Sequence, residues 1–365
     1  MKRFIAVELF AGGGGLSLGA SRAGFDISLA VELDRRFLPT YRVNHPRTTL
    51  LELDVSDVKG EELLTQIPEG RIDLLMGCAP CQGFCSLTSK LQREDPRNKL
   101  VLEMARIVEE SLPTVVLMEN VPGLAWRGRH LLDEFVARLR RVGYIVQWEV
   151  VQMADFGVPQ NRKRLVLLAG RGFSIAMPSP THTNSIVRPK GVKPWRTLYD
   201  AIHGEPAPLL LSKSQKSGGP SAVKWHVVRD LGPTTKARLK AVKPGQMRMS
   251  LRDELLPECH RGGYSGFRNV YMRMSWDKPS STITAGCTTP AKGRFGHPQR
   301  SRTTISVREA ATIQTFPKSY RIVTDNIDIA CQMIGNAVPP RFAECLASQA
   351  LEALKNNNEK LGRHR

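Results

Sequence analysis

Residues 4–20, FIAVELFAGGGGLSLGA, predict a strand, a glycine loop and the start of a helix in immediate succession. The apolar side chains of Ile5, Val7 and Leu9 alternate as in a strand, and those after Gly15 recur at helical spacing. A strand, glycine loop and helix form the first half of a nucleotide-binding βαβ unit, in which glycines let the backbone approach a ligand closely. The stretch therefore predicts an α/β fold.

Two acidic residues stand where such a fold binds an adenosine. Glu32 follows a second apolar strand, residues 27–31, at the position where a carboxylate accepts hydrogen bonds from ribose hydroxyls. Asp54 ends a third predicted strand, residues 49–53, and suits an adenine amino group. The N-terminal segment thus predicts an adenosine-containing cofactor without identifying it.

A loop with three cysteines follows another short predicted strand. Residues 72–76 form an apolar run closed by Gly77, and Cys78, Cys81 and Cys85 come next. A strand that delivers Cys81 onto a turn shaped by Pro and Gly presents a nucleophile, whose reactive form is the thiolate. The spacing of the three cysteines also suits a metal or an iron–sulfur cluster, and inert core residues are the third interpretation. This stretch alone does not separate the three.

Further elements repeat the βα rhythm. Residues 115–118 predict a strand that ends at Glu119, residues 130–141 a helix, and residues 144–151 and 165–169 two more strands. This alternation predicts a doubly wound, mainly parallel sheet. Such folds bind ligands at the carboxyl ends of their strands, which favours a functional role for Glu119.

Two arginines lie in the segment 157–164. Arg162 and Arg164 are two residues apart and would face the same way on an extended chain. They could serve phosphate binding or surface electrostatics. The functional interpretation is that two guanidiniums hold a base edge and a carboxylate.

Composition adds a strong charge signal. The 365 residues carry a net charge of +19, and residues 171–300 hold 22 Lys and Arg against 7 Asp and Glu. A basic block of this kind predicts a polyanionic partner, most simply nucleic acid. The chain has no apolar run long enough to span a membrane. Seven cysteines without an export signal favour reduced thiols in a cytosol.

Taken in order, these motifs resemble the DNA (cytosine-5) methyltransferase family, bacterial type. The matching stretches are residues 10–15, Glu32 and Asp54, Pro80-Cys81-Gln82, Glu119-Asn120-Val121, residues 160–164, residues 273–284 and residues 335–339. The resemblance implies a Rossmann-like domain dependent on S-adenosylmethionine over residues 1–174 and 321–365. A smaller, basic target recognition domain would span residues 175–320.

The resemblance also implies a reaction. A methyl group passes from S-adenosylmethionine to C5 of a cytosine flipped out of a specific double-stranded DNA sequence, and S-adenosylhomocysteine is released. Cys81 would attack C6 of the base, and Glu119 would donate a proton or hydrogen bond at N3. Arg164 would contact the base carbonyl, and Arg162 would orient Glu119. The sequence does not indicate which side chain, if any, acts as the base that removes the C5 proton.

The binding residues that the resemblance implies fall into two sets, and no metal is expected. The cofactor residues are Phe10, Ala11, Gly12, Gly13, Gly14, Gly15, Leu16, Glu32, Leu33, Asp54, Val55, Pro80, Asn336 and Ala337. The DNA contacts are Gln82, Cys85, Gln160, Arg261, Tyr264, Arg268 and Arg273. Two residues depart from the common pattern, since Cys85 replaces a serine and Leu33 replaces an aromatic residue.

Other functions explain less of the sequence. A dehydrogenase would account for the glycine loop and Glu32 but not for Cys81 or the basic block. A catalytically inactive DNA-binding regulator and a tRNA-methylating enzyme are the remaining alternatives, and the intact motifs and the long basic segment favour an enzyme acting on DNA. We expect a monomer in the bacterial cytoplasm or nucleoid. The recognised sequence and the presence of a cognate restriction endonuclease stay open.

Overall fold

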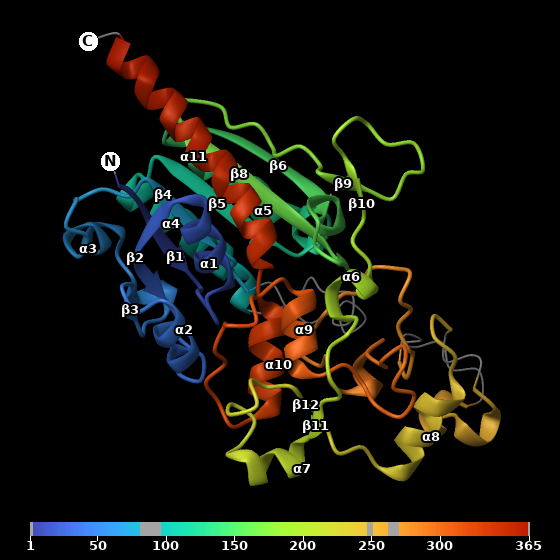
Figure 1. Ribbon diagram of the computed structural model, residues 1–365. Coiled ribbons are helices and arrows are strands. Elements are labelled where there is room, and N and C mark those ends of the chain that lie inside the picture. The colour runs from blue at the N-terminus through green and yellow to red at the C-terminus, as the bar shows by residue number, and fades with distance from the viewer. Residues whose placement is uncertain (1–2, 81–95, 247–250, 262–269, 364–365) are drawn as a thin grey trace. The chain divides into compact units, whose positions relative to one another are not determined.

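The computed structural model describes residues 3–80, 96–246, 251–261 and 270–363 and divides into two compact units (Figure 1). The first comprises Met1–Phe156, Lys163–Thr181 and Val338–Arg365, and the second comprises Gly157–Arg162 and His182–Ala337. Residues 157–162 and 321–337, which the sequence assigned to the catalytic domain, therefore belong to the second unit. Residues 175–181 belong to the first.

The first unit is built on a seven-stranded sheet. Its strands are β1 (Phe4–Leu9), β2 (Phe25–Val31), β3 (Thr49–Leu51), β4 (Leu74–Gly77), β5 (Val115–Asn120), β6 (Tyr144–Gln152) and β8 (Lys163–Arg171). They run in the order β3-β2-β1-β4-β5-β8-β6, and the first five are parallel. Strand β8 is antiparallel to both of its neighbours. The sheet confirms the mainly parallel α/β fold.

Helices cover both faces of this sheet. Alternate side chains of β1, Ile5, Val7 and Leu9, share one apolar core with α3 (Gly60–Thr65), α4 (Leu100–Ser111) and α5 (Arg129–Arg141). Because successive residues of a strand point to opposite faces, Glu8 points the other way. That face carries α1 (Gly15–Ala23) and the long helix α11 (Pro340–Arg363), with α2 (Leu38–Asn44) beside the loop that follows β2 (Figure 1).

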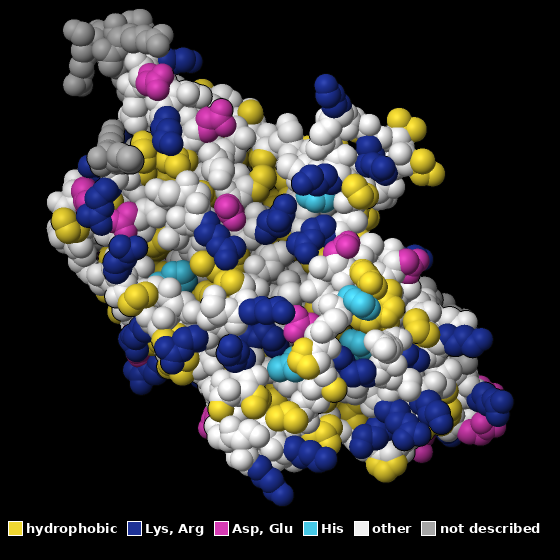
Figure 2. Space-filling view, in the orientation of Figure 1, with side chains coloured by type: hydrophobic (Ala, Val, Ile, Leu, Met, Phe, Trp, Pro, Cys, Tyr) yellow, Lys and Arg dark blue, Asp and Glu magenta, His cyan; other side chains and the backbone are white. Residues whose placement is uncertain are grey.

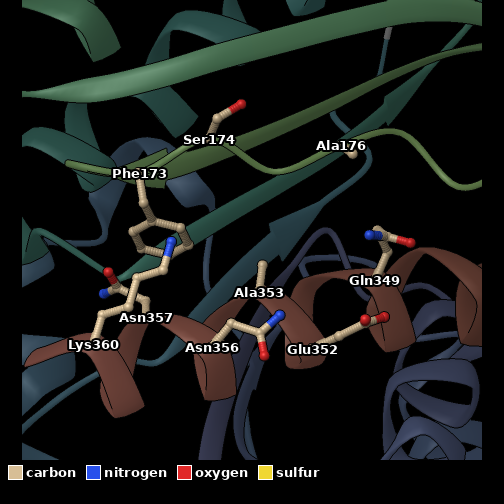
Figure 3. Close-up of a pocket in the computed structure, with 9 residues that line it drawn as sticks. All are labelled: Phe173, Ser174, Ala176, Gln349, Glu352, Ala353, Asn356, Asn357 and Lys360. Carbon is tan, nitrogen blue, oxygen red and sulfur yellow. The ribbon is translucent and has the colours of Figure 1, made fainter. Parts of the chain in front are cut away.

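Helix α11 packs directly on α1. A Cβ atom at Gly19 would lie 2.3 Å from Cβ of Ala343, so only glycine permits this approach. The helix is 24 residues long and reaches Arg363. A hollow of about 370 Å³ between α11 and residues 173–176 contains none of the predicted site residues (Figure 3).

The second unit is made of short elements. Its strands are β7 (Gln160–Asn161), β9 (His182–Thr183), β10 (Lys193–Pro194), β11 (Leu209–Leu210), β12 (Val227–Val228) and β13 (Ser280–Ser281). Its α-helices are α6 (Leu198–Ile202), α7 (Leu211–Ser214), α8 (Pro233–Ala241), α9 (Val307–Ile313) and α10 (Ile327–Asn336). Within the described residues of the chain, no helix is long and apolar enough to cross a membrane.

Candidate active site

The glycine loop that follows β1 has a left-handed backbone conformation at three positions. Phe10, Gly12 and Gly14 have φ values of 58°, 53° and 82°, in the left-handed region that favours glycine. The amide of Ala11 donates to Val31 O at 3.0 Å, which ties the loop to the end of β2. A Cβ added at Gly12 would meet no atom of the described residues within 4 Å. The loop therefore leaves open space at Gly12 that a ligand could fill.

A buried polar network lies under this loop. The carboxylate of Glu8, only 2% exposed, accepts hydrogen bonds from the amide and the hydroxyl of Ser17 in the first turn of α1. The Ser17 hydroxyl also meets the hydroxyl of Tyr41 at 2.7 Å, and His45 contacts Gly14 O at 3.2 Å. Burial raises the pKa of Glu8 to about 8 and lowers that of His45 to about 4. The network fixes the loop and the start of α1 from below.

Glu32 joins the end of β2 to the glycine loop. One carboxylate oxygen accepts from the amide of Gly12 at 2.6 Å, and the other accepts from the amide of Asp34 at 2.7 Å. Burial raises the pKa of Glu32. Leu33 beside it is 58% exposed. An acid at this strand end, next to a glycine loop, is the arrangement that holds a ribose in nucleotide-binding folds.

Asp54 lies beyond the end of β3 rather than at it. The strand ends at Leu51, two residues before the predicted end, and Asp54 caps a 3-10 helix, Val55–Asp57, by accepting from the amide of Ser56 at 2.9 Å. The amide of Glu32 donates to Leu51 O at 3.0 Å, so the two acidic segments are neighbours.

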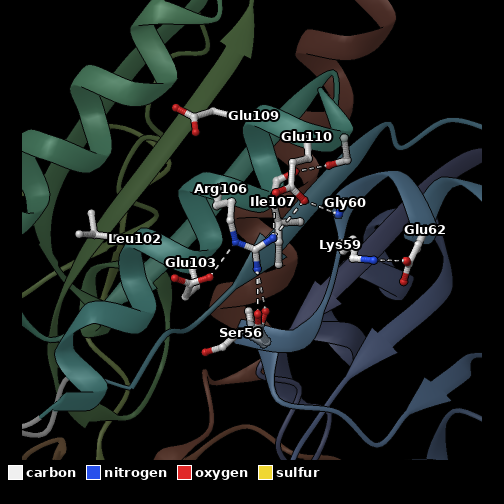
Figure 4. A network of polar contacts seen from close by, with 12 residues as sticks. Ser56, Lys59, Gly60, Glu62, Leu102, Glu103, Arg106, Ile107, Glu109 and Glu110 are labelled. Atoms are coloured by element: carbon white, nitrogen blue, oxygen red, sulfur yellow. Dashed lines mark hydrogen bonds and ion pairs between the residues drawn. The ribbon is translucent and has the colours of Figure 1, made fainter.

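An ion-pair network holds the Asp54 turn against helix α4 (Figure 4). Arg106 of α4 pairs with Glu103 at 2.8 Å and with Glu110 at 2.9 Å. Its guanidinium also donates to Val55 O at 3.2 Å, and Glu110 accepts from the amide of Gly60 at 2.6 Å. The turn that carries Asp54 and Val55 is thus anchored on both sides.

Strands β4 and β5 end side by side at the same edge of the sheet. Gly77 pairs with Met118, and the side-chain amide of Asn120 donates to Ala79 O at 3.1 Å. Burial and the neighbouring carboxylates of Glu119 and Glu8 raise the pKa of the Cys78 thiol. Pro80 is the last described residue before the predicted nucleophile.

Several predicted site residues lie outside the described part of the chain. They are Cys81, Gln82, Cys85, Tyr264 and Arg268. Among the residues that are described, no group of three His, Cys, Asp or Glu side chains could hold a metal ion.

Glu119 lies beside a cation on the adjacent strand. The carboxyl group is 5% exposed, and its Oε1 lies 3.0 Å from Nε of Arg164 at the start of β8. The guanidinium of Arg164 also donates to its neighbour, Lys163 O, at 2.8 Å. The sequence had given the contact with Glu119 to Arg162 and the base carbonyl to Arg164. The partner that the structure places on Glu119 is Arg164.

Arg162 donates three hydrogen bonds inside the second unit. Its guanidinium is 2% exposed and donates to Ile283 O at 2.9 Å, to Gly335 O at 3.2 Å and to Ala337 O at 3.4 Å. These bonds join β7 to the strand-like segment after β13 and to the end of α10. Arg162 therefore organises the backbone of this unit.

Gln160 belongs to the same internal network. It is fully buried, its amide nitrogen donates to Gln314 at 2.7 Å, and its amide oxygen accepts from Ile283 N at 2.8 Å. Gln314 in turn donates to Ile334 O at 2.6 Å. The predicted DNA contact by Gln160 is not supported, because both ends of its amide are used within the unit.

The predicted cofactor motif at residues 335–337 ends helix α10. A Cβ at Gly335 would lie 2.1 Å from the carbonyl carbon of Thr284, so this position requires glycine. Asn336 is exposed and Ala337 is half-buried.

Two further arginines had been predicted to contact DNA. Arg273 is 8% exposed and donates to the backbone carbonyls of Val242 and His297 at 3.2 and 3.1 Å, and also to that of Pro298. These bonds give Arg273 an internal role, and its contact with DNA stays a prediction. Arg261 is exposed, and its assignment stays a prediction.

Positive charge is concentrated in the second unit. It holds 26 Lys and Arg against 10 Asp and Glu, whereas the first unit holds 27 against 24. Figure 2 shows Lys and Arg side chains over α7 and α8. The sequence-based prediction of a basic segment thus corresponds to one compact body.

Comparison with known proteins identifies the family. Residues 4–352 match the family described as C-5 cytosine-specific DNA methylase. The Type II methylase M.HgiDII of Herpetosiphon aurantiacus is 34% identical over 360 residues, 97% of each chain. The Type II methyltransferase M1.HphI of Haemophilus parahaemolyticus is 33% identical over 97% of this chain and 87% of its own length.

Solved structures share the fold. A protein from E. coli, described as a DNA modification methyltransferase encoded within a prophage, superposes with a TM-score of 0.72 at 24% identity, covering 96% of this chain and 99% of its own. The Dnmt2 methyltransferase of S. pombe gives a TM-score of 0.63 at 17% identity, covering 97% and 99%.

Proposed function

The chain belongs to the C-5 cytosine-specific DNA methylase family, and on that premise we propose which of its residues carry out the reaction. It is a DNA (cytosine-5-)-methyltransferase of the bacterial Type II kind. The family uses a methyl donor and forms a covalent intermediate with the target cytosine. The roles of individual residues are our assignment.

The end of β1 and the turns after β2 and β3 would hold S-adenosylmethionine. Open space at Gly12 lets the backbone approach the ligand, Glu32 suits the ribose hydroxyls, and Asp54 suits the adenine edge. Leu33 supplies an exposed apolar surface next to Glu32. Pro80, Asn336 and Ala337 complete the set that the sequence motifs indicate. When bound, the cofactor supplies an electrophilic methyl group on a sulfonium.

Cys81 would be the nucleophile. Cytosine C5 is too weakly nucleophilic to accept a methyl group directly, and attack of a thiolate at C6 converts C5 into an enamine-like carbon. After methylation, loss of the C5 proton and elimination of the thiolate restore the aromatic ring. The target base must leave the helical stack for this chemistry, which requires base flipping.

Glu119 and Arg164 would act together on the pyrimidine ring. Negative charge develops on the ring as the thiolate adds, and a protonated Glu119 can donate to N3. Arg164 Nε lies 3.0 Å from Glu119 Oε1, where a guanidinium would stabilise the carboxylate that remains once the proton has passed to N3. A guanidinium there also stabilises negative charge on the nearby ring carbonyl. The ion pair is the observation that carries this assignment.

The second unit would bind the DNA around the target. It carries nearly all of the net positive charge, which favours contacts with phosphates, while a few side chains would read base edges in the major groove. We assign it the target recognition role and place the enzyme on double-stranded DNA in the cytoplasm. A matching restriction endonuclease would be a functional partner.

The experiment that tests the function is transfer of tritium from labelled S-adenosylmethionine to unmethylated double-stranded DNA. We expect the label in 5-methylcytosine after hydrolysis of the DNA, and no label in tRNA offered in parallel. Label in tRNA alone would keep the chemistry and overturn the substrate. Label in neither DNA nor tRNA would contradict the proposed methyltransferase activity.

A further inference from the structure

The second unit contains a cavity that none of the assignments above uses. It has a volume of about 310 Å³ and lies between the turn at residues 221–225 and the loop at residues 318–323. Its lining consists of Ser221, Lys224, Trp225, Arg308 and residues 318–323. We call it the basic pocket.

Among the described residues, four cations and no carboxylate line the basic pocket. Lys224, Lys318 and Arg321 are exposed side chains, whereas Arg308 is 6% exposed. Glu205 lies outside the lining and pairs with Lys318 at 2.6 Å, which offsets one charge. Glu205 also acts on the guanidinium of Arg308, so the positive charge of the pocket rests on its lining as a whole.

Arg308 forms part of the buried floor. Its guanidinium donates to Lys224 O at 2.7 Å and to Tyr320 O at 3.0 Å, so it joins the turn to the loop. Burial lowers the pKa of Arg308, but a guanidinium stays charged at any physiological pH. Carbonyl oxygens satisfy these N–H groups without cancelling the charge, and the positive field persists in the pocket.

The turn is held in a conformation that costs free energy. Lys224 and Trp225 have φ values of 52° and 61°, and two successive non-glycine residues in the left-handed region are unusual. Trp225 is fully buried and its indole N–H donates to Ile322 O at 3.0 Å. The hydroxyl of Ser221 donates to the same carbonyl at 3.3 Å. These hydrogen bonds join the two sides of the pocket and fix the strained turn, residues 221–225, against the loop, residues 318–323.

We propose that the basic pocket binds a phosphate group of the DNA backbone. A pocket lined by several cations and the exposed Ser319, with no carboxylate among its described lining residues, matches the charge and hydrogen-bonding capacity of a phosphate. It lies in the unit that carries most of the positive charge, which favours a phosphodiester over a free anion. The proposal rests on DNA being the substrate and adds a contact that fixes the position of the backbone.

Two substitutions test this assignment, Arg321→Gln and Lys224→Gln. Both remove one exposed charge, and neither residue belongs to the proposed catalytic set. We expect each to weaken binding of duplex DNA about 3- to 10-fold in low salt and to reduce the slope of log Kd against log salt by about 0.9. The rate constant of methyl transfer at saturating DNA should stay within twofold of wild type. Thermal unfolding checks that the variants fold.

Matched controls are Lys355→Gln and Lys360→Gln, which remove exposed charges from α11 of the first unit. They should leave the affinity and the salt slope unchanged. Equal losses in controls and pocket variants would overturn the proposal, because a general charge effect would then suffice. Wild-type affinity and slope in both pocket variants would overturn it as well.

Titration with inorganic phosphate distinguishes a phosphate group of DNA from a free phosphate ion as the ligand of the pocket. Quenching of tryptophan fluorescence by millimolar phosphate, lost in Arg321→Gln while DNA affinity is unaffected, would assign the pocket to a free anion and contradict a DNA contact. Methylation of DNA by the wild type, measured in the same preparation, tests the proposed function independently. A wild type that methylates DNA, with pocket variants that bind it normally, would refute only the pocket.

Discussion

Glu119 Oε1 lies 3.0 Å from Arg164 Nε, so the buried carboxyl at the end of β5 is paired with a cation on the neighbouring antiparallel strand. The pair joins an acid that can serve N3 of the cytosine to a guanidinium that can serve its carbonyl. Strand β8 places Arg164 there because its register sets Leu165 opposite Asn120.

Substitution of Arg164 should reduce catalysis. We expect Arg164→Gln to lower kcat about 100-fold, because the charge next to the developing oxyanion is lost. Arg164→Lys should retain more activity, since it keeps the charge but not the planar fork. Steady-state methyl transfer measures both variants. Equal losses in Lys and Gln would show that charge is not the essential property.

Arg162 should matter for stability. Arg162→Met removes hydrogen bonds to three backbone carbonyls at roughly 1 kcal/mol each, so the free energy of unfolding of the second unit should fall by about 3 kcal/mol. Urea denaturation measures the change. Arg261→Met, at an exposed position of the same unit, is the control and should stay within about 0.5 kcal/mol of wild type. Similar values for the two variants would contradict the bracing role of Arg162.

Gly12 should be needed for cofactor binding rather than for folding. A Cβ there meets no atom of the part of the chain that the structure describes, so Gly12→Ala should weaken binding of S-adenosylmethionine at least about 10-fold, with a loss of stability limited to the backbone strain of about 1 kcal/mol. Calorimetric titration gives the affinity. Gly70→Ala is a matched control, since Gly70 has a φ of 59° and equally open surroundings. It should lower stability to the same extent and leave the affinity unchanged. Unaltered affinity in Gly12→Ala would place the cofactor elsewhere.

The buried carboxyl of Glu8 should make stability depend on pH. Its folded-state pKa of about 8 exceeds the ordinary value of 4.5, so the folded state keeps a proton that the unfolded state loses. The contribution of Glu8 to stability is therefore fully present below pH 4.5 and is lost as the pH rises towards 8. The maximal slope for one proton is about 1.4 kcal/mol per pH unit.

His45 acts in the opposite direction over part of this range. Its folded-state pKa of about 4 lies below the ordinary value of 6.5, so its contribution favours folding as the pH rises from 4 to 6.5. A comparison with Glu8→Gln isolates the carboxyl. We expect the free energy of unfolding of Glu8→Gln, relative to wild type, to increase steadily between pH 4.5 and 8. A difference that does not vary with pH would contradict a protonated Glu8.

Local patterns predicted the ends of two strands to within a residue or two. Glu32 directly follows β2, and Glu119 lies in β5, one residue before its end. Asp54 was placed less well, because β3 is a short edge strand that ends at Leu51 and a capped 3-10 turn takes over. An edge strand pairs with only one neighbouring strand. The residue at which it ends therefore depends little on the apolar pattern of its own sequence.

Long-range polar contacts could not be predicted from the sequence. Gln160 bonds to Gln314 across 154 residues, and Arg162 bonds to Gly335 across 173. No local spacing reports such partners, and for that reason Gln160 and Arg273 were assigned to DNA although both are buried. The different contacts of Arg162 and Arg164 could not be predicted for the same reason. They depend on which of the two units each residue belongs to.

Covalent attack by Cys81 is the central claim, and trapping the adduct tests it most directly. The enzyme is incubated with S-adenosylmethionine and long duplex DNA in which 5-fluorocytosine replaces cytosine. Fluorine at C5 is not removed as a proton is, so the bond between Sγ and C6 persists through denaturing electrophoresis. We predict a protein–DNA band for the wild type and for Cys78→Ser, and none for Cys81→Ser. A band of equal intensity from Cys81→Ser, or its absence from the wild type on DNA that the enzyme methylates in unfluorinated form, would contradict the mechanism.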